Sequence, residues 1–493
     1  MTDDPGYVRV ARDLWRAQRE GPPGIRRRQE RRLASLVAHA RARSPLYARL
    51  YAGLPSTDVE LRDLPPTTKP ELMAAFDDWL TDRTITREVL EAFIADPSLA
   101  GTPFRSQLFV CTTSGTTGHP GLFVHDQQAI SVFRAMTIVR LDLVWLGAAD
   151  WLRAARKGFR WAAVAGTGAH FGGTGWVEFE RHRNPLLSRA YRVFSVQRPI
   201  SDLVPALNAF DPAIVTTYPS ALELLGDEQA AGRLHIRPTV LEMGGESTSL
   251  EARTRLAGIF GRPVHEVYAC TEFLSMAVDC AEGWLHVSSD WVILEPVDAD
   301  LRPTAPGTPS HTVLLTSLAD RLQPIIRYDL GDSVLARPDP CPCGSPFPAI
   351  RVEGRRDDVL RFAGSAGRSV TVLPLAISAE MERVPGVRRS QLVQTGPMAL
   401  EVRLDPEPSA DAARVWQGVL AALRAYLDRQ GLASVDLARA SRLPEQNPTS
   451  GKFRQVIAAQ AASAGERPAE RDALPLPGGP AGAPSPPVAV GRS

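Results

Sequence analysis

The stretch "FVCTTSGTTGHPGLF", residues 109–123, decides how this sequence is interpreted. Every residue from Thr112 to Gly121 is Thr, Ser, Gly, Pro or His, and the flanking residues are apolar. A loop of this composition after a strand gives backbone N–H groups close access to an anion, and its hydroxyls add donors. It is not the G-x-x-x-x-G-K-[ST] nucleotide loop, because no Lys-Ser/Thr pair closes it. A flexible surface loop without a ligand is the simpler alternative.

The size and charge of the chain narrow the class of protein. At 493 residues it is too long for one compact core, so we expect two or more domains. A net charge of +1 argues against a nucleic-acid or anionic-membrane partner. No apolar run reaches the about 18 residues that span a bilayer, and the N-terminus lacks the pattern of a signal peptide. These features predict a cytoplasmic enzyme or binding protein.

Strand-like and helix-like runs alternate between about residues 105 and 335. "AIVTTY" leads to "PSALELLGDEQAAG", and "PTVLEMGG" leads to "LEARTRLAGIFG". This alternation predicts a parallel α/β sheet. We therefore expect a large N-terminal α/β domain of several subdomains over residues 1–353, a small α+β C-terminal domain over residues 354–460, and a disordered tail rich in Pro, Gly and Ala over residues 461–493.

Two further stretches carry residues suited to a nucleotide. In "YACTE", residues 268–272, the aromatic ring can stack on a base, the Thr can donate to a phosphate, and the Glu can hold Mg²⁺. In "PIIRYDLGDSV", residues 324–334, Asp332 follows a glycine in a tight turn and can accept from two ribose hydroxyls. Each stretch by itself has an equally good explanation without a ligand. Residues 268–272 could be a strand end that carries an acid by chance, and Asp332 could be an ordinary turn aspartate.

Two more stretches lie toward the C-terminus. In "EGRRDDVLRFAG", residues 353–364, Arg355 can reach a ribose or phosphate, and Asp357 can act as a hinge; a solvated linker is the alternative. In "NPTSGKFRQV", residues 447–456, Lys452 follows a glycine in a loop. Only three of the 56 basic residues are lysines, at positions 69, 157 and 452, so a retained lysine hints at a need for an amine. An ordinary surface lysine is the alternative.

The order of these stretches resembles that of the adenylate-forming superfamily of acyl-CoA synthetases, peptide-synthetase adenylation domains and luciferases. Within it the chain is similar to the phenylacetate–CoA ligase family. "LPPTTKPEL" (64–72) is similar to that family's "LPFTTK" segment, and "MGGES" (243–247) stands where the family has a Gly-Ala-Glu-Pro turn. "EGWLHVSSDWVILEPVD" (282–298) resembles a further family run. The resemblance covers roughly residues 10–460.

The resemblance implies an acid–CoA ligase that uses ATP, Mg²⁺ and CoA. The acid is expected to be aromatic. Its carboxylate would attack the α-phosphorus of ATP, and pyrophosphate would leave. The acyl group would then pass to the CoA thiol. The small domain would rotate about Asp357 between the two steps, and Lys452 would bridge the carboxylate and the α-phosphate. The implied roles are phosphate contacts for Thr112, Ser114, Gly115, Thr116, Thr117, Gly118 and His119; an adenine seat of Gly245, Glu246 and Tyr268; ribose contacts for Asp332 and Arg355; Mg²⁺ on Glu272; and catalytic roles for Lys452, Glu272 and Thr271.

The sequence departs from the family pattern in three places. The acidic motif reads Tyr-Asp-Leu-Gly-Asp, residues 328–332, rather than Tyr-Arg-Thr-x-Asp. The phosphate loop usually reads Gly-Lys-Pro, and here His119 replaces the lysine, so a cation is present there only when the imidazole is protonated. The stretch "FAGSAGRSVTVLPL", residues 362–375, also differs, and this region borders the acceptor tunnel in relatives. An amine, a carrier-protein thiol or another small nucleophile therefore stays open as acceptor. A nucleotide-binding protein without catalysis is an alternative of another class, and a homodimer is an open assembly.

Four residues suggest a metal site. "CPCG", residues 341–344, places Cys341 and Cys343 in a Pro-rich turn, and Cys280 and His286 precede them by about sixty residues. Three thiols and one imidazole would satisfy a structural, tetrahedral zinc site. Free thiols in a loop are the alternative, since the five cysteines are too few and too scattered for a disulfide framework.

Overall fold

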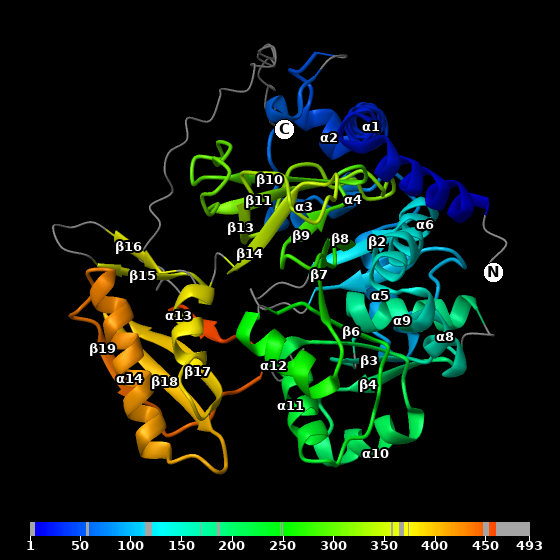
Figure 1. Cartoon of the computed structure of the whole chain (residues 1–493). Helices are drawn as coiled ribbons and strands as arrows, with labels where there is room; N and C mark the ends of the chain where they lie inside the picture. The colour runs from blue at the N-terminus through cyan, green and yellow to red at the C-terminus, as the bar shows by residue number, and fades with distance from the viewer. Residues whose placement is uncertain are drawn as a thin grey trace, which may run out of the picture.

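The computed structural model describes these ranges of the chain: residues 5–55, 59–113, 121–167, 169–184, 188–246, 248, 250–355, 358–363, 369–372, 374–446 and 453–459. The predicted tail over residues 461–493 lies outside them. Figure 1 shows a large domain, which runs from blue to yellow-green, and a small yellow-to-orange domain beside it.

The large domain is built from many short elements. Its helices are α1 (Pro5–Arg43), α2 (Pro45–Leu50), α3 (Lys69–Ala74), α4 (Phe76–Trp79), α5 (Arg87–Ile94), α6 (Gln127–Met136), α7 (Leu143–Trp145), α8 (Ala148–Arg156), α9 (Gly172–Arg183), α10 (Ile200–Phe210), α11 (Pro219–Ala230) and α12 (Leu250–Phe260). Its strands are β1 (Phe109–Thr112), β2 (Leu122–His125), β3 (Trp161–Ala165), β4 (Tyr191–Ser195), β5 (Ile214–Thr217), β6 (Val240–Gly244), β7 (Val264–Cys270), β8 (Phe273–Asp279), β9 (Leu285–Val287), β10 (Val292–Val297), β11 (Thr312–Ser317), β12 (Tyr328–Asp329), β13 (Asp332–Ala336) and β14 (Ala349–Arg355).

The main sheet joins a parallel half to an antiparallel half. Among the described residues it has nine strands, in the order β13-β14-β9-β8-β7-β6-β5-β3-β4. Strands β4, β3, β5, β6 and β7 pair in parallel, and the other four strands extend the sheet in antiparallel fashion. Helices α11 and α12 connect β5, β6 and β7, as parallel strands require. The predicted α/β class is thus confirmed.

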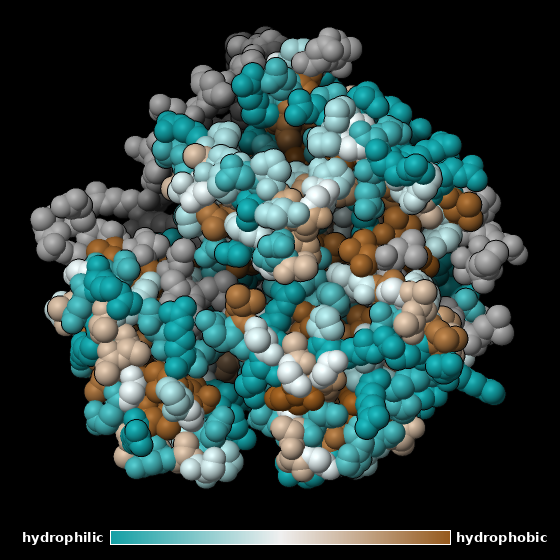
Figure 2. Space-filling view, in the orientation of Figure 1, coloured by the Kyte–Doolittle hydropathy of each residue, from teal (hydrophilic) through white to brown (hydrophobic). Residues whose placement is uncertain are grey.

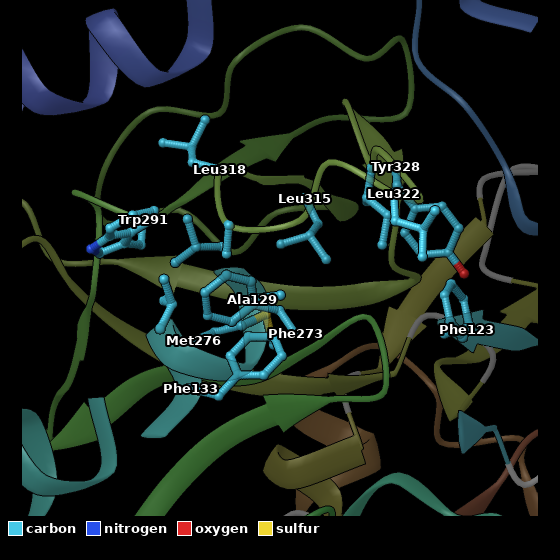
Figure 3. Close-up of a cluster of buried hydrophobic side chains, with 14 of the residues drawn as sticks. Phe123, Ala129, Phe133, Phe273, Met276, Trp291, Leu315, Leu318, Leu322 and Tyr328 are labelled. Atoms are coloured by element: carbon cyan, nitrogen blue, oxygen red, sulfur yellow. The ribbon is translucent and has the colours of Figure 1, made fainter. Parts of the chain in front are cut away.

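A cluster of buried side chains attaches α6 to the main sheet. Figure 3 shows part of it, with Phe133 of α6 close to Phe273 of β8. Their rings meet edge to face with centroids 5.0 Å apart, a favourable arrangement for aromatic pairs. Helix α6 begins where the Asp126 carboxylate accepts from the backbone N–H of Ala129 at 2.8 Å. This packing fixes the end of β2 against β8.

The long helix α1 is bent and anchored by buried charges. Gly21 has a φ of 67° and is followed by Pro22 and Pro23, so the helix kinks there. Beyond the kink, Arg32 Nη1 donates to the carbonyl of Asp290 at 2.5 Å. The Asp290 side chain is itself fully buried, so α1 is tied to the interior of the large domain rather than lying loosely on its surface.

The small domain has its own sheet and core. Its elements are β15 (Leu360–Ala363), β16 (Ser369–Val372), α13 (Pro374–Glu382), β17 (Val387–Gly396), β18 (Ala399–Pro406), α14 (Ala412–Arg429), β19 (Asp436–Arg439) and β20 (Val456–Ile457). Its four-stranded sheet has the order β19-β18-β17-β20. Leu392 of β17, Val402 of β18 and Leu423 of α14 belong to a separate hydrophobic cluster, as expected of an independent domain.

The surface of the protein is mainly hydrophilic on the face shown in Figure 2, with apolar patches over both domains and a notch between them at the lower edge. Within the described ranges, none of the helices combines the length and the hydropathy that crossing a bilayer requires.

Candidate functional site

Four of the described candidate residues lie where parallel strands of the main sheet end. Gly245 and Glu246 follow β6, and Thr271 and Glu272 follow its neighbour β7. Ligands of open α/β sheets bind at this carboxyl edge. The turn after β6 needs its two glycines: a Cβ on Gly244 would lie 2.8 Å from the carbonyl oxygen of Val267, and Gly245 has a φ of 80°.

Tyr268 of β7, Asp332 of β13 and Arg355 of β14 form a hydrogen-bonded group. Tyr268 Oη donates to Asp332 Oδ2 at 2.7 Å, and Arg355 Nη1 lies 3.2 Å from Asp332 Oδ1. Burial, together with the charge of Asp332, raises the pKa of Tyr268, which therefore stays a neutral donor. Asp332 is buried, whereas the Arg355 side chain is 46% exposed. The structure thus brings together the predicted ribose residues and the predicted aromatic residue.

Glu272 is a buried carboxylate next to this group. Its Oε1 accepts from Tyr328 Oη at 2.9 Å. Burial and the neighbouring Glu272 charge raise the pKa of Tyr328, so this partner is a neutral donor as well. Carboxylate oxygens are ligands that suit Mg²⁺, so Glu272 is a candidate to hold this ion.

The two ends of the predicted phosphate loop are held together. Thr113 N–H donates to the carbonyl of Gly121 at 2.9 Å, and Gly121 N–H donates to Thr113 Oγ1 at 2.7 Å. Thr112 is buried, and its N–H donates to the carbonyl of His170 at 2.7 Å. The loop residues between these ends, Ser114, Gly115, Thr116, Thr117, Gly118 and His119, lie outside the described residues.

The structure describes the environment of two of the three lysines. A Cβ on Gly121 would lie 2.9 Å from Cε of Lys69, so the Lys69 side chain runs past the end of the phosphate loop. Lys157 Nζ donates to Asp211 Oδ1 at 2.5 Å and to the carbonyl of Arg237 at 2.9 Å, which gives it a structural role. The third, Lys452, lies outside the described residues, as does Asp357.

The segment that follows Lys452 contacts the large domain. Phe453 N–H donates to Glu246 Oε1 at 2.5 Å. Next to the predicted hinge, Arg454 donates to the carboxylate of Asp358. Glu246 therefore faces the small domain, a contact that no local pattern in the sequence predicts.

The four predicted metal ligands do come together. The ligand atoms of Cys280, His286, Cys341 and Cys343 all lie within 4.8 Å of one another. The Sγ atoms of Cys280 and Cys341 are 3.8 Å apart, and Cys343 Sγ lies 3.1 Å from His286 Nε2. His286 Nδ1 lies 3.0 Å from the carbonyl of Phe347, the arrangement in which a metal-binding imidazole is fixed by its second nitrogen.

A buried ion pair beside Thr271 was missed by the sequence analysis. His125 Nδ1 lies 3.0 Å from Asp320 Oδ2, and its Nε2 lies 3.0 Å from the carbonyl of Thr271. Both partners accept, so the ring satisfies both only when each nitrogen carries a proton. Burial opposes that charge, but the hydrogen bonds to Asp320 and Cys111 outweigh it and hold the pKa of His125 well above 6.5. The imidazolium thereby fixes the turn that carries Glu272.

We expect His125→Gln to lower the free energy of unfolding by about 3 kcal/mol at pH 6, because it leaves a buried carboxylate without its cation. The pKa of His125 is higher in the folded protein than in the unfolded chain, where it is about 6.5. The stabilisation from its charge is therefore complete below pH 6.5, and it is lost as the pH rises through the pKa of the folded state. The difference between wild type and variant should therefore shrink above pH 6.5. Denaturant unfolding at several pH values measures it.

His265→Gln is the matched control for this prediction. His265 also faces an aspartate, with Nδ1 3.1 Å from Asp279 Oδ1, but burial and Arg253 lower the pKa of His265 to about 4. At pH 6 the unfolded His265 is partly protonated whereas the folded residue is neutral, so the effect of His265→Gln on stability should grow by about 1 kcal/mol between pH 6 and pH 8, in the direction opposite to that of His125→Gln. A His125→Gln effect that grows in the same way over this range would show that His125 is neutral in the folded protein.

No family model matches the chain, and no curated protein sequence matches it. Among solved structures, a 2-hydroxyisobutyryl-CoA ligase in the postadenylation state with R3-HIB-AMP has a TM-score of 0.60 at 20% identity, over 89% of this chain and 90% of that chain. An anthranilate CoA ligase in complex with anthranoyl-AMP has a TM-score of 0.51 at 16% identity, over 70% and 64%. The chain has the fold of these acyl-CoA ligases of the adenylate-forming type.

Proposed function

We propose that this protein is an AMP-forming acid–CoA ligase. The observation that carries the proposal is the convergence of Tyr268, Glu272, Asp332 and Arg355 with the closed base of the phosphate loop at one edge of the sheet. Each of these groups suits one part of ATP. A neighbour of the same fold is a CoA ligase with an acyl-adenylate bound, which supports the same chemistry here.

The proposed reaction has two steps. The carboxylate of the acid attacks the α-phosphorus of ATP, the bond to the β-phosphate oxygen breaks, and pyrophosphate leaves. The thiol of CoA then loses its proton and attacks the acyl carbonyl, and AMP leaves. In the first step Asp332 and Arg355 hold the ribose, Tyr268 and Gly245 border the adenine, and the loop of residues 112–119 contacts the phosphates with its N–H and hydroxyl groups.

We assign Mg²⁺ to Glu272. Oxygen ligands suit this ion, and the Glu272 carboxylate is buried at the right edge of the sheet with a neutral partner, Tyr328. A bound Mg²⁺ would neutralise charge on the phosphates. Thr271, whose carbonyl His125 holds, is assigned as the neighbouring donor to a phosphate. A location in the cytoplasm and a homodimer stay predictions from the sequence.

The identity of the acid and of the acceptor is the first thing to measure. Neighbours of the same fold include ligases for a small branched hydroxy acid and for an aromatic acid, so both classes belong in the assay. We expect acid-dependent release of pyrophosphate from ATP and formation of a CoA thioester. Pyrophosphate release without thioester would point to an amine or carrier-protein acceptor. ATP binding without any release would favour the non-catalytic alternative.

Lys452→Ala should slow adenylation on the order of 10²-fold or more, because a fixed cation on the developing charge contributes a few kcal/mol. Transfer from a preformed acyl-adenylate to CoA should change little. Pyrophosphate release and thioester formation measure the two steps separately.

Lys157→Ala is the control for the lysine prediction, because the Lys157 ammonium holds Asp211 and a backbone carbonyl far along the chain from the site. It should lower thermal stability and leave the adenylation rate of folded protein unchanged. Normal pyrophosphate release by Lys452→Ala would remove Lys452 from the reaction.

We also propose that Cys280, His286, Cys341 and Cys343 hold one structural zinc ion. In a tetrahedral site with Zn–S bonds of about 2.3 Å, two thiolates lie about 3.8 Å apart. The distance between the Sγ atoms of Cys280 and Cys341 is 3.8 Å, much longer than a disulfide bond. Four protein ligands leave no open position for substrate, which favours a structural role.

Elemental analysis of the purified protein should find one zinc per chain. The double variant Cys341→Ser/Cys343→Ser should lose the metal and unfold at a lower temperature, whereas Cys111→Ala should keep it, because Cys111 lies outside this cluster. Zinc-free protein whose three thiols react freely with an alkylating agent under native conditions would contradict the assignment.

A further inference from the structure

The two domains are joined by a hydrogen bond directly beside the predicted catalytic lysine. Phe453, the residue after Lys452, donates its backbone N–H to Glu246 Oε1 at 2.5 Å. Phe453 belongs to the small domain, where it pairs with Gln446 in a β-bridge and leads into β20. Glu246 belongs to the large domain, in the turn after β6.

The Glu246 carboxylate is fixed on its own side of this contact. Its second oxygen, Oε2, accepts from the backbone N–H of Ser220 at 3.1 Å. Ser220 lies in the first turn of α11, a helix of 12 residues, and a carboxylate is favourable at the positive end of a helix. The carboxylate is thus held in position by α11, with one oxygen directed at the small domain.

Phe453 is equally fixed on the side of the small domain. The guanidinium of Arg389, on β17, lies over the Phe453 ring at 4.7 Å from its centroid. Two residues further on, Gln455 Nε2 donates to Glu382 Oε1 at 2.5 Å. These contacts attach the backbone at Phe453 to the rest of the small domain. The bond between Phe453 and Glu246 therefore connects the small domain as a whole to the large domain.

The neighbouring charges are compatible with this contact. Glu223 lies on the next turn of α11, and the charges of Glu246 and Glu382 both act on its carboxyl group. Burial and the charge of Glu382 raise the pKa of Glu223 to about 8, so it is mainly protonated at neutral pH and does not repel Glu246. Among the nearby cations, Arg255 and Arg389 act in the opposite direction and lower the pKa of Glu223.

We propose that Glu246 is a positioning residue that docks the Lys452 segment onto the large domain for adenylation and releases it for acyl transfer. The proposal rests on the proposed function. A bond to the residue after Lys452 fixes where that lysine can reach, whereas an adenine contact would leave the lysine unaffected. Glu246 and Phe453 are both only partly buried, so water can replace the bond when the small domain rotates, and the docking is reversible.

The test is Glu246→Gln, assayed in the two half-reactions. A carboxylate accepts from both N–H groups, but the amide has one acceptor, so one of Ser220 and Phe453 loses its partner. Acid-dependent pyrophosphate release should slow about tenfold, while the KM for ATP and the transfer from preformed acyl-adenylate to CoA stay unchanged. Glu251→Gln is the control, because Glu251 is a half-exposed acid on α12 whose carboxylate lies 3.6 Å from Arg383 of the small domain; it should behave as wild type.

Two results would overturn the proposal. A higher KM for ATP with unchanged turnover would make Glu246 an adenine contact. An equal loss in both half-reactions, together with a lower melting temperature, would make it only the N-terminal cap of α11.

Hydrogen–deuterium exchange tests the docking without any assay of the reaction. The peptide that contains residues 446–459 should exchange faster in Glu246→Gln than in wild type and Glu251→Gln. Unchanged exchange would contradict the docking role even if the protein proves to be a ligase. Faster exchange in a protein that releases no pyrophosphate with any acid would keep the interdomain contact and reject the proposed function instead.

Discussion

The buried carboxylate of Asp332 is the constraint on which the site depends. A buried charge must be satisfied by donors, and Asp332 obtains them from Tyr268 on β7 and Arg355 at the end of β14. The strands that carry these donors lie on opposite sides of the junction between the parallel and antiparallel halves of the sheet. The hydrogen bonds therefore fix the edge where the nucleotide would bind, and they do so at the last strand before the small domain begins.

Two further contacts lie on either side of this group. On one side the imidazolium of His125 holds the carbonyl of Thr271, and with it the turn that presents Glu272. On the other side Glu246, in the turn after the neighbouring strand, receives the backbone of Phe453. The same sheet edge thus connects the base of the phosphate loop, the acidic residue and the segment after the lysine. This is the arrangement that an enzyme needs when one group must reach the α-phosphate only in one domain orientation.

Local patterns in the sequence were enough to predict the parallel half of the main sheet and to name several residues that the structure places close together. The apolar runs quoted from the sequence predicted β5, α11, β6 and α12, because each of these elements shows its own periodicity. The metal ligands could be named from the sequence because Cys341 and Cys343 share one short turn. The structure brings this turn to His286, because β14, which follows the turn, pairs with β9, which contains His286. The ion pair of His125 and Asp320 spans 195 residues, and the bond between Glu246 and Phe453 spans 207. No periodicity or motif encodes such contacts, because they arise only when distant segments pack.

The central claim is that an acid is activated by transfer of AMP to its carboxylate. Incubating the protein with ATP, CoA and an acid labelled with ¹⁸O in both carboxylate oxygens tests it most directly. If the carboxylate attacks the α-phosphorus, one labelled oxygen must stay on phosphorus when the thiol displaces AMP, so mass spectrometry should find AMP carrying one ¹⁸O. Thioester formation with unlabelled AMP, or with ADP and labelled inorganic phosphate, would contradict the account.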